Sequence, residues 1–181
     1  MKIVLASNSP RRKEILSLAG YNFEVMASCY DENICGCIFS KELVENCAKQ
    51  KALSIKITDS VIIGADTVVV LNNTILGKPK DRDEAYLMLS SLSNKTHFVA
   101  TSICLIKNEK IIKDTEITNV AFRKLSPEEI ISYINLKNPL DKAGSYGIQD
   151  EGFDFVSKVQ GDIDNVVGFP VKLFEKMLKS L

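Results

Sequence analysis

Two neighbouring arginines near the N-terminus are the first residues that could do chemistry. Arg11 and Arg12 follow a short apolar run and stand directly after Ser9-Pro10. Serine followed by proline is typical of a helix start, so both guanidinium groups are expected in a first helical turn. Unpaired backbone N–H groups and the helix dipole favour an anion there and disfavour a bare cation. The position favours a phosphate site, although an arginine pair alone leaves a solvated basic surface open as the alternative.

An aspartate inside an apolar run is the second candidate. Asp66 separates VIIGA, residues 61–65, from VVVL, residues 68–71, with only Thr67 between. Burying a carboxylate is costly unless it is paired, hydrated or bound to a metal ion. The run therefore indicates either a functional acid or a break in the strand at which Asp66 faces solvent.

Three further features carry weaker signals. Residues 144–149, GSYGIQ, place two glycines three positions apart, which lets a backbone approach a ligand closely, although most such loops are only turns. Lys78 lies in a GKP segment, but the sequence has no Walker A pattern, so it is not a P-loop lysine. Asp31 and Glu32, taken by themselves, are typical of surface charge.

The cysteines and the single histidine do not match a known metal motif. Cys29, Cys35 and Cys37 lack the spacing and the second pair that zinc sites use, and His97 has no ligand at suitable spacing. The 5 cysteines are an odd number, which favours reduced thiols over a disulfide framework.

Composition and charge exclude several classes of protein. With 181 residues, 45% of them hydrophobic and 25% charged, the chain is typical of a single globular domain spanning residues 1–181. Lys+Arg and Asp+Glu balance at 23 each, so no global positive field would attract nucleic acid or an acidic membrane. The N-terminal apolar run is too short for a signal peptide, and no stretch is apolar enough to span a membrane. We therefore expect a cytoplasmic protein.

Hydrophobic periodicity and turn signals place the candidate residues on alternating strands and helices. Two expected capping boxes, Asp81 with Glu84 and Ser126 with Glu129, mark helix starts. Strands are expected at residues 2–6, 23–27, 61–71, 96–107, 110–123 and 153–159, and helices at residues 10–19, 40–56, 81–92, 126–136 and from 170 onward. The fourth and fifth strands form a hairpin. This mixture predicts an α/β or α+β fold, with a mixed sheet and flanking helices.

Six segments, in order along nearly the whole chain, resemble the Maf family of nucleoside triphosphate pyrophosphatases. They are LASNSPRRKEIL, AKQKA, GADTVV, GKP, DKAGSYGIQ and NVVGFP. The resemblance implies hydrolysis between the α and β phosphates, giving a nucleoside monophosphate and pyrophosphate, with a divalent metal cation such as Mg or Mn. It also implies two lobes around a cleft, a fold distantly like the inosine triphosphate pyrophosphatases, and a homodimer.

The resemblance assigns roles to particular residues. Asp66 matches the catalytic acid-base residue of the family. Arg12, Thr67 and Gln149 match its specificity positions, and their combination resembles the dTTP/UTP branch. The positions that match other polar pocket residues are Ser7, Arg11, Lys51 and Lys78, and those that match metal-site acids are Glu32 and Asp66.

Elementary acid-base chemistry is consistent with the implied metal. Water and a model aspartate differ by roughly 12 pKa units, about 16 kcal/mol for complete proton transfer. Asp66 alone is too weak a base, and a divalent ion that acidifies the attacking water closes much of that gap. Arg11, Arg12, Lys51 and Lys78 would neutralise the triphosphate and the departing pyrophosphate.

Two other functions stay open at this point. A non-catalytic nucleotide-binding regulator of cell division or septum formation could keep the same pocket, although a pure triphosphate binder gains little from a buried acid. An enzyme that removes modified nucleotides could also use this pocket, because one cavity can accept ordinary and altered bases.

Overall fold

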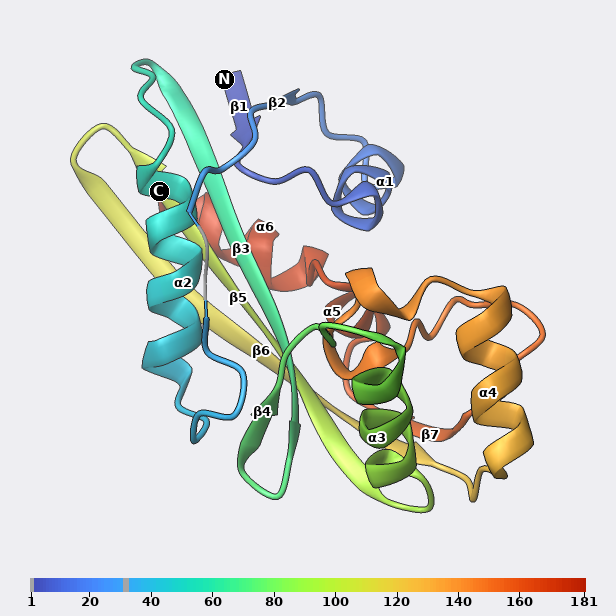
Figure 1. The fold of residues 1–181 in the computed structure, drawn as a ribbon. Coiled ribbons are helices and arrows are strands. Elements are labelled where there is room, and N and C mark those ends of the chain that lie inside the picture. The colour runs from blue at the N-terminus through green and yellow to red at the C-terminus, as the bar shows by residue number, and fades with distance from the viewer. Residues whose placement is uncertain (1, 31–32) are drawn as a thin grey trace.

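Strands and helices alternate along the chain in the computed structural model, which describes residues 2–30 and 33–181. The strands are β1 (Lys2–Leu5), β2 (Glu24–Val25), β3 (Ser60–Leu71), β4 (Thr74–Leu76), β5 (Thr96–Lys107), β6 (Lys110–Phe122) and β7 (Val156–Gln160). They form one 7-stranded sheet in the order β2-β1-β3-β5-β6-β7, with β4 paired to β3 (Figure 1). The sheet is mixed, because β1 is parallel to β2 and β3 while the remaining pairs are antiparallel.

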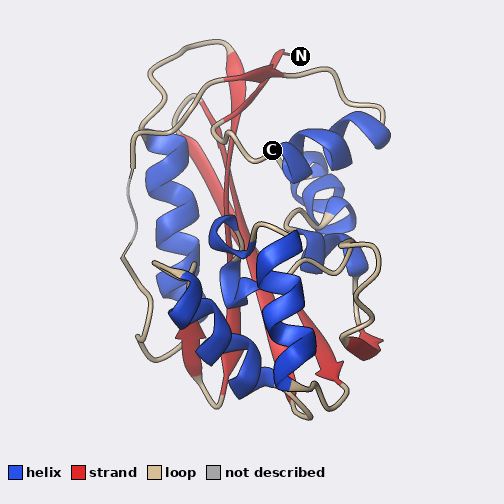
Figure 2. Ribbon diagram, turned by 45° about the vertical axis from the view of Figure 1, so that its right-hand side comes forward, coloured by secondary structure: helices blue, strands red, loops and turns tan. Residues whose placement is uncertain are grey.

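Helices cover both faces of this sheet, as Figure 2 shows for the blue helices on either side of the red strands. They are α1 (Pro10–Leu18), α2 (Lys41–Leu53), α3 (Arg82–Leu92), α4 (Pro127–Leu136), α5 (Ile163–Val167) and α6 (Val171–Lys179), with short 3-10 turns η1 (Pro139–Asp141) and η2 (Ala143–Ser145). α2 packs on one face through Ala48 and Ala52. The other helices pack on the opposite face, where α1, α5 and α6 share one apolar cluster and α3 and α4 share another. Sandwiched in this way, β3 is buried at every position except Thr67.

One edge of β3 is interrupted, and this interruption makes room for a cleft. The opposite edge of β3 pairs with β5 almost throughout. On the interrupted edge, β1 pairs with residues 60–63 and β4 with residues 69–71. Residues 64–68 of this edge have no strand partner among the described residues. Because successive side chains of a strand point to opposite faces, Asp66 and Thr67 lie on the two sides of the opening.

Most of the predicted elements are confirmed, with differences that have physical causes. β3 is continuous through Asp66, which is 4% exposed, so the alternative of a strand break is wrong. The hairpin of β5 and β6 and the capping box of Ser126 and Glu129 are confirmed. Asp81 caps α3, but Glu84 accepts from the N–H of Lys80 instead of closing a box. The last strand begins at Val156, three residues later than expected, and α5 was not predicted.

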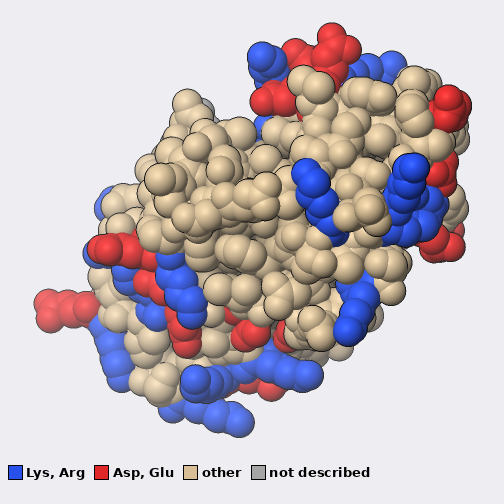
Figure 3. All heavy atoms as spheres, turned by 90° about the horizontal axis from the view of Figure 1, so that it is seen from below, with Lys and Arg blue, Asp and Glu red and all other residues tan. Residues whose placement is uncertain are grey.

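Charged side chains of both signs are interspersed on the surface. Figure 3 shows Lys and Arg beside Asp and Glu toward the two ends of the face seen from below, and a broad area of other residues between them that a few basic side chains interrupt. This pattern agrees with the formal net charge of +0. Within the described residues, no helix is long and apolar enough to cross a membrane.

Candidate functional site

A cavity of about 570 Å³ opens where the edge of β3 is interrupted. Its wall combines the start of α1, the middle of β3, α2, and the segments 141–150 and 166–168. The structure thus brings together eight predicted site residues from distant parts of the sequence: Ser7, Arg11, Arg12, Lys51, Asp66, Thr67, Lys78 and Gln149. The ninth, Glu32, lies outside the described residues, as does its neighbour Asp31.

A buried ion pair forms the floor of the cavity. Lys51 Nζ lies 2.6 Å from Asp66 Oδ1, and the two side chains are only 11% and 5% exposed. Lys51 reaches β3 because α2 lies directly against Gly64, where an added Cβ would be 2.1 Å from the carbonyl oxygen of Ala48. A glycine two residues before the acid therefore sets the distance between the helix that carries the lysine and the strand that carries the aspartate.

The second carboxylate oxygen of Asp66 is unsatisfied by the described part of the chain. Oδ2 is buried, and it has no hydrogen-bond partner among the described residues. A buried polar atom of this kind is costly unless water, an ion or a ligand meets it. A carboxylate oxygen is also the donor type that Mg²⁺ and Mn²⁺ prefer, so Asp66 fits a divalent cation. Within the described residues, no group of three or more His, Cys, Asp or Glu side chains could hold a metal by itself.

Arg12 is buried in protein contacts on the other side of the opening. It is 9% exposed, and its guanidinium donates to the hydroxyl oxygens of Ser7 and Thr67 and to the carbonyl oxygen of Gly168, at 3.0 to 3.1 Å. Two of the three predicted specificity positions, Arg12 and Thr67, are therefore direct partners. The head group of Arg12 is therefore largely occupied by the protein.

Arg11 instead pairs with an acid at the rim that the sequence did not single out. Arg11 Nη1 lies 3.1 Å from Asp141 Oδ2, and Nη2 donates to the Asp141 carbonyl oxygen at 3.3 Å. The two side chains are 28% and 43% exposed. Burial raises the pKa of Asp141, but hydrogen bonds and charges from Lys142 and Arg11 outweigh it and hold the pKa below the ordinary value. Asp141 begins the DKAGSYGIQ segment, in which only the glycines and Gln149 were predicted to have a role, so no local pattern marked Asp141.

The segment that carries Gln149 closes the cavity at the rim. Gln149 is exposed, whereas Tyr146, three residues earlier, is 7% exposed and its hydroxyl lies 2.7 Å from His97 Nε2. Gly144 N–H donates to the carbonyl oxygen of Gly77, which ties this segment to the loop of Lys78. Burial lowers the pKa of His97 to about 4, so at neutral pH it is an uncharged partner of Tyr146 and not a ligand for an anion.

The fold and the cavity define the class first: a mixed α/β protein in which cationic side chains surround a buried carboxylate, an arrangement suited to a phosphorylated ligand. The family model described as Maf-like protein matches residues 2–181, and the chain belongs to this family. The resemblance drawn from the sequence motifs is thereby confirmed.

Similar curated proteins agree with this placement. A dTTP/UTP pyrophosphatase of Bacillus cereus (strain G9842) is 46% identical over 180 residues, covering 98% of this chain and 94% of the relative. A dTTP/UTP pyrophosphatase of Aquifex aeolicus (strain VF5) is 44% identical over 185 residues, covering 100% and 96%. Among solved structures, a HAM1 protein from Coxiella burnetii aligns with a TM-score of 0.45 at 15% identity, over 67% of this chain and 73% of that one.

Proposed function

We propose that the chain is a nucleoside triphosphate pyrophosphatase that hydrolyses dTTP and UTP to the nucleoside monophosphate and pyrophosphate. The observation that carries the proposal is the buried Asp66 at the floor of a cavity lined by Arg11, Lys51 and Lys78. The cavity volume of about 570 Å³ is in the range of small-molecule sites, which suits a nucleotide. Relatives at 44% and 46% identity carry the name dTTP/UTP pyrophosphatase.

The cations of the cavity would act on the phosphates. In the proposed reaction a water oxygen bonds to the α phosphorus, the bond from that phosphorus to the bridging oxygen breaks, and pyrophosphate leaves. Negative charge develops on the leaving oxygens, and fixed cations at the site stabilise it. Arg11 and Lys78 are exposed enough to meet the phosphates, while Lys51 holds Asp66 Oδ1 in place. As the water oxygen bonds to phosphorus, its proton passes to Asp66 Oδ2, the carboxylate oxygen that Lys51 does not hold.

A divalent cation, Mg or Mn, belongs to this proposal. Asp66 and Glu32 would lie beside it, and when bound it would lower the pKa of the water that attacks. The buried and unsatisfied Oδ2 supports this role for Asp66. The role of Glu32 rests on the family resemblance.

The base would be selected at Arg12, Thr67 and Gln149. The side-chain amide of Gln149 offers both a donor and an acceptor, which suits the paired carbonyl and N–H edge of uracil or thymine. Arg12 donates to the Thr67 hydroxyl oxygen, and both residues donate to the carbonyl oxygen of Gly168. These hydrogen bonds fix Arg12 and Thr67 as one wall of the cavity. Gln149 is exposed and can turn toward the base.

The remaining parts of the proposal concern partners and location. We propose one functional domain over residues 1–181, a homodimer as in the family, a cytoplasmic location, and no nucleic-acid partner. The balance of 23 basic and 23 acidic residues supports the last point.

The direct test is to incubate the protein with UTP, dTTP, CTP, GTP and ATP, with Mg or Mn, and to measure monophosphate and pyrophosphate. We expect turnover of UTP and dTTP, and a loss of about 10³-fold in Asp66→Asn, assayed at a temperature at which circular dichroism shows that both proteins are folded. Binding of UTP without turnover would favour the regulator of cell division instead. Release of orthophosphate together with an equal amount of nucleoside diphosphate would contradict cleavage between the α and β phosphates.

A further inference from the structure

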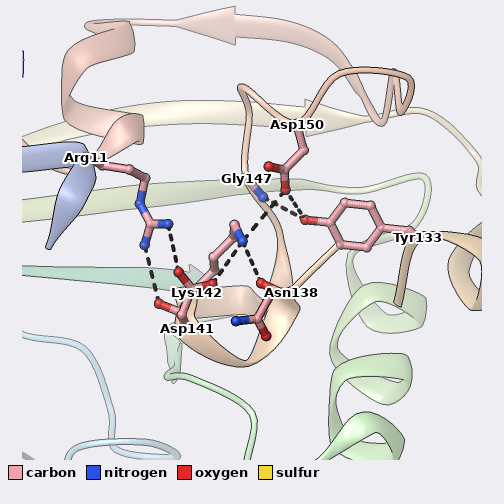
Figure 4. Close-up of polar contacts among 7 residues, drawn as sticks. All are labelled: Arg11, Tyr133, Asn138, Asp141, Lys142, Gly147 and Asp150. Carbon is pink, nitrogen blue, oxygen red and sulfur yellow. Dashed lines mark hydrogen bonds and ion pairs between the residues drawn. The ribbon is translucent and has the colours of Figure 1, made fainter. Parts of the chain in front are cut away.

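A buried tyrosine holds the loop that carries Gln149. Tyr133 on α4 is 1% exposed, and its hydroxyl donates to Asp150 Oδ2 at 2.5 Å (Figure 4). The same hydroxyl oxygen accepts from the N–H of Gly147 at 3.0 Å. Asp150 N–H in turn donates to the carbonyl oxygen of Gly147 at 3.1 Å, which closes residues 147–150 into a turn. Gln149 therefore lies between two residues that one hydroxyl group fixes.

The chemistry of Tyr133 makes both hydrogen bonds available at once. Burial, and then the hydrogen bond to the Asp150 carboxylate, raise the pKa of Tyr133 above its ordinary value. The hydroxyl therefore keeps its proton over the whole physiological range and can donate only one hydrogen bond. Because Asp150 takes that bond, the tyrosine oxygen is left to accept the Gly147 N–H.

The fit around Asp150 is close. An added Cβ at Gly147 would lie 2.8 Å from Asp150 Oδ2 and 3.0 Å from Lys142 Cε, so a larger residue at 147 would displace the Asp150 carboxylate from its place. Lys142 Nζ is 3.9 Å from Asp150 Oδ2 and 2.9 Å from Asp141 Oδ1. Figure 4 shows Lys142 between the two carboxylates, with Arg11 on the far side of Asp141. The turn is thus joined by charges to the residue that meets the phosphates.

We propose that Tyr133 and Asp150 are positioning residues that set the place of Gln149 and thereby the base preference of the enzyme. This assignment rests on the proposed function, in which Gln149 reads the base. Gln149 is exposed and belongs to a side-chain type with much rotamer freedom, so its own packing does not place it. The backbone around Gln149 is instead held by Tyr133, whose side chain is not among the described residues that line the cavity.

The proposal is tested by Tyr133→Phe, with Tyr86→Phe as the matched control. Tyr86 on α3 packs, half-buried, against the same apolar cluster and lies outside the described lining of the cavity. The readout is the ratio of kcat/KM for UTP to that for GTP. We expect Tyr133→Phe to lower this ratio about tenfold, through a higher KM for UTP, and Tyr86→Phe to leave it unchanged. An unchanged ratio in Tyr133→Phe, or an equal fall in the control, overturns the proposal.

Two variants of Asp150 separate positioning from general loosening. Asp150→Asn keeps an oxygen that accepts from Tyr133, so it should retain most of the UTP preference. Asp150→Ala removes the acceptor and should lose about as much preference as Tyr133→Phe, while Lys142 keeps its contacts with Asp141 and the Asn138 carbonyl oxygen. If both Asp150 variants lose the preference equally, the hydrogen bond from Tyr133 is not what positions the turn.

The variant Gln149→Ala, alone and combined with Tyr133→Phe, distinguishes failure of this inference from failure of the proposed base-reading role. If Gln149→Ala leaves the UTP to GTP ratio intact, the base-reading role of Gln149 is wrong, and the inference falls with it. If Gln149→Ala collapses the ratio but Tyr133→Phe does not, only the inference is wrong. The supporting result is that both single variants lower the ratio and that Tyr133→Phe adds nothing further in the Gln149→Ala background.

Discussion

The ion pair at the floor of the cavity and the ion pair at its rim are built differently. Lys51 and Asp66 are 11% and 5% exposed, come from a helix and a central strand, and are set together by the close contact at Gly64. Arg11 and Asp141 are 28% and 43% exposed and come from a helix start and a 3-10 turn. Buried pairs are held rigidly and are costly to break, whereas exposed pairs contribute little. The Lys51–Asp66 pair is thus suited to hold one geometry. The Arg11–Asp141 pair is suited to open, so that Arg11 can exchange Asp141 for a ligand phosphate.

The largest effect is expected where the floor depends on backbone contact. Gly64→Ala places a Cβ 2.1 Å from the Ala48 carbonyl oxygen, so α2 must move away from β3. We expect a loss of about 3 kcal/mol or more in the free energy of unfolding, measured in urea, with loss of activity. Gly77→Ala is the control, because its Cβ would meet Cys35 Cβ at 3.1 Å, and a shift of a few tenths of an ångström in the exposed Cys35 relieves that contact. Equal stability of the two variants would contradict the close-contact argument.

The second-largest effect on stability is expected for the buried Lys51. Lys51→Met removes the cation that pairs with Asp66 Oδ1 at 2.6 Å and leaves its carboxylate in a buried site. We expect a loss of about 3 kcal/mol of stability from thermal or urea unfolding. Lys113→Met, which breaks a pair with Glu45 at 3.4 Å and 28% and 18% exposure, should cost less. A smaller loss for Lys51→Met than for Lys113→Met would show that the floor pair is not the tighter one.

A pH effect should come from the histidine that supports the rim segment. Burial lowers the pKa of His97 from 6.5 to about 4, so between these values the unfolded chain binds a proton that the native state excludes. Protonation of His97 therefore changes the free energy of unfolding very little above about pH 7. As the pH falls it lowers this free energy, by about 1.4 kcal/mol at pH 5.5. His97→Gln keeps a polar partner for Tyr146 and should flatten the difference in melting temperature between pH 8 and pH 5.5. If the melting temperature of His97→Gln falls as much between pH 8 and pH 5.5 as that of the parent protein, His97 is not the source of the pH effect.

The smallest effect is expected at the rim pair. Asp141→Asn removes the charge that holds Arg11, so stability should change by less than about 1 kcal/mol. With the carboxylate charge gone and the Asp141 carbonyl oxygen still accepting from Nη2, Arg11 should bind phosphate better, which predicts a KM for UTP lowered about threefold in steady-state kinetics. Glu24→Gln, which breaks the exposed pair with Lys2 at 3.0 Å, is the control and should leave KM unchanged. A higher KM in Asp141→Asn would mean that Asp141 orders the site and does not compete with the substrate.

The difference between floor and rim also explains which parts were predictable. Asp66 was visible in the sequence because a carboxylate in the run VIIGADTVVVL violates the apolar pattern of a buried strand. Arg11 and Arg12 were visible because they follow a helix-start signal. Asp141, Lys142 and Asp150 lie in a polar loop, where charged residues are ordinary, so no local pattern could distinguish them.

The sequence by itself determined the alternation of strands and helices, the hairpin of β5 and β6, the start of α4 and the family, because these depend on local periodicity, caps and ordered motifs. Only the tertiary structure decided that β3 runs unbroken through Asp66, that β1 and β4 leave the edge at residues 64–68 open, and that Arg12 is occupied by Ser7, Thr67 and Gly168. The reason is that these features join residues up to 156 positions apart. Such contacts depend on how the layers pack, which no short stretch of sequence encodes.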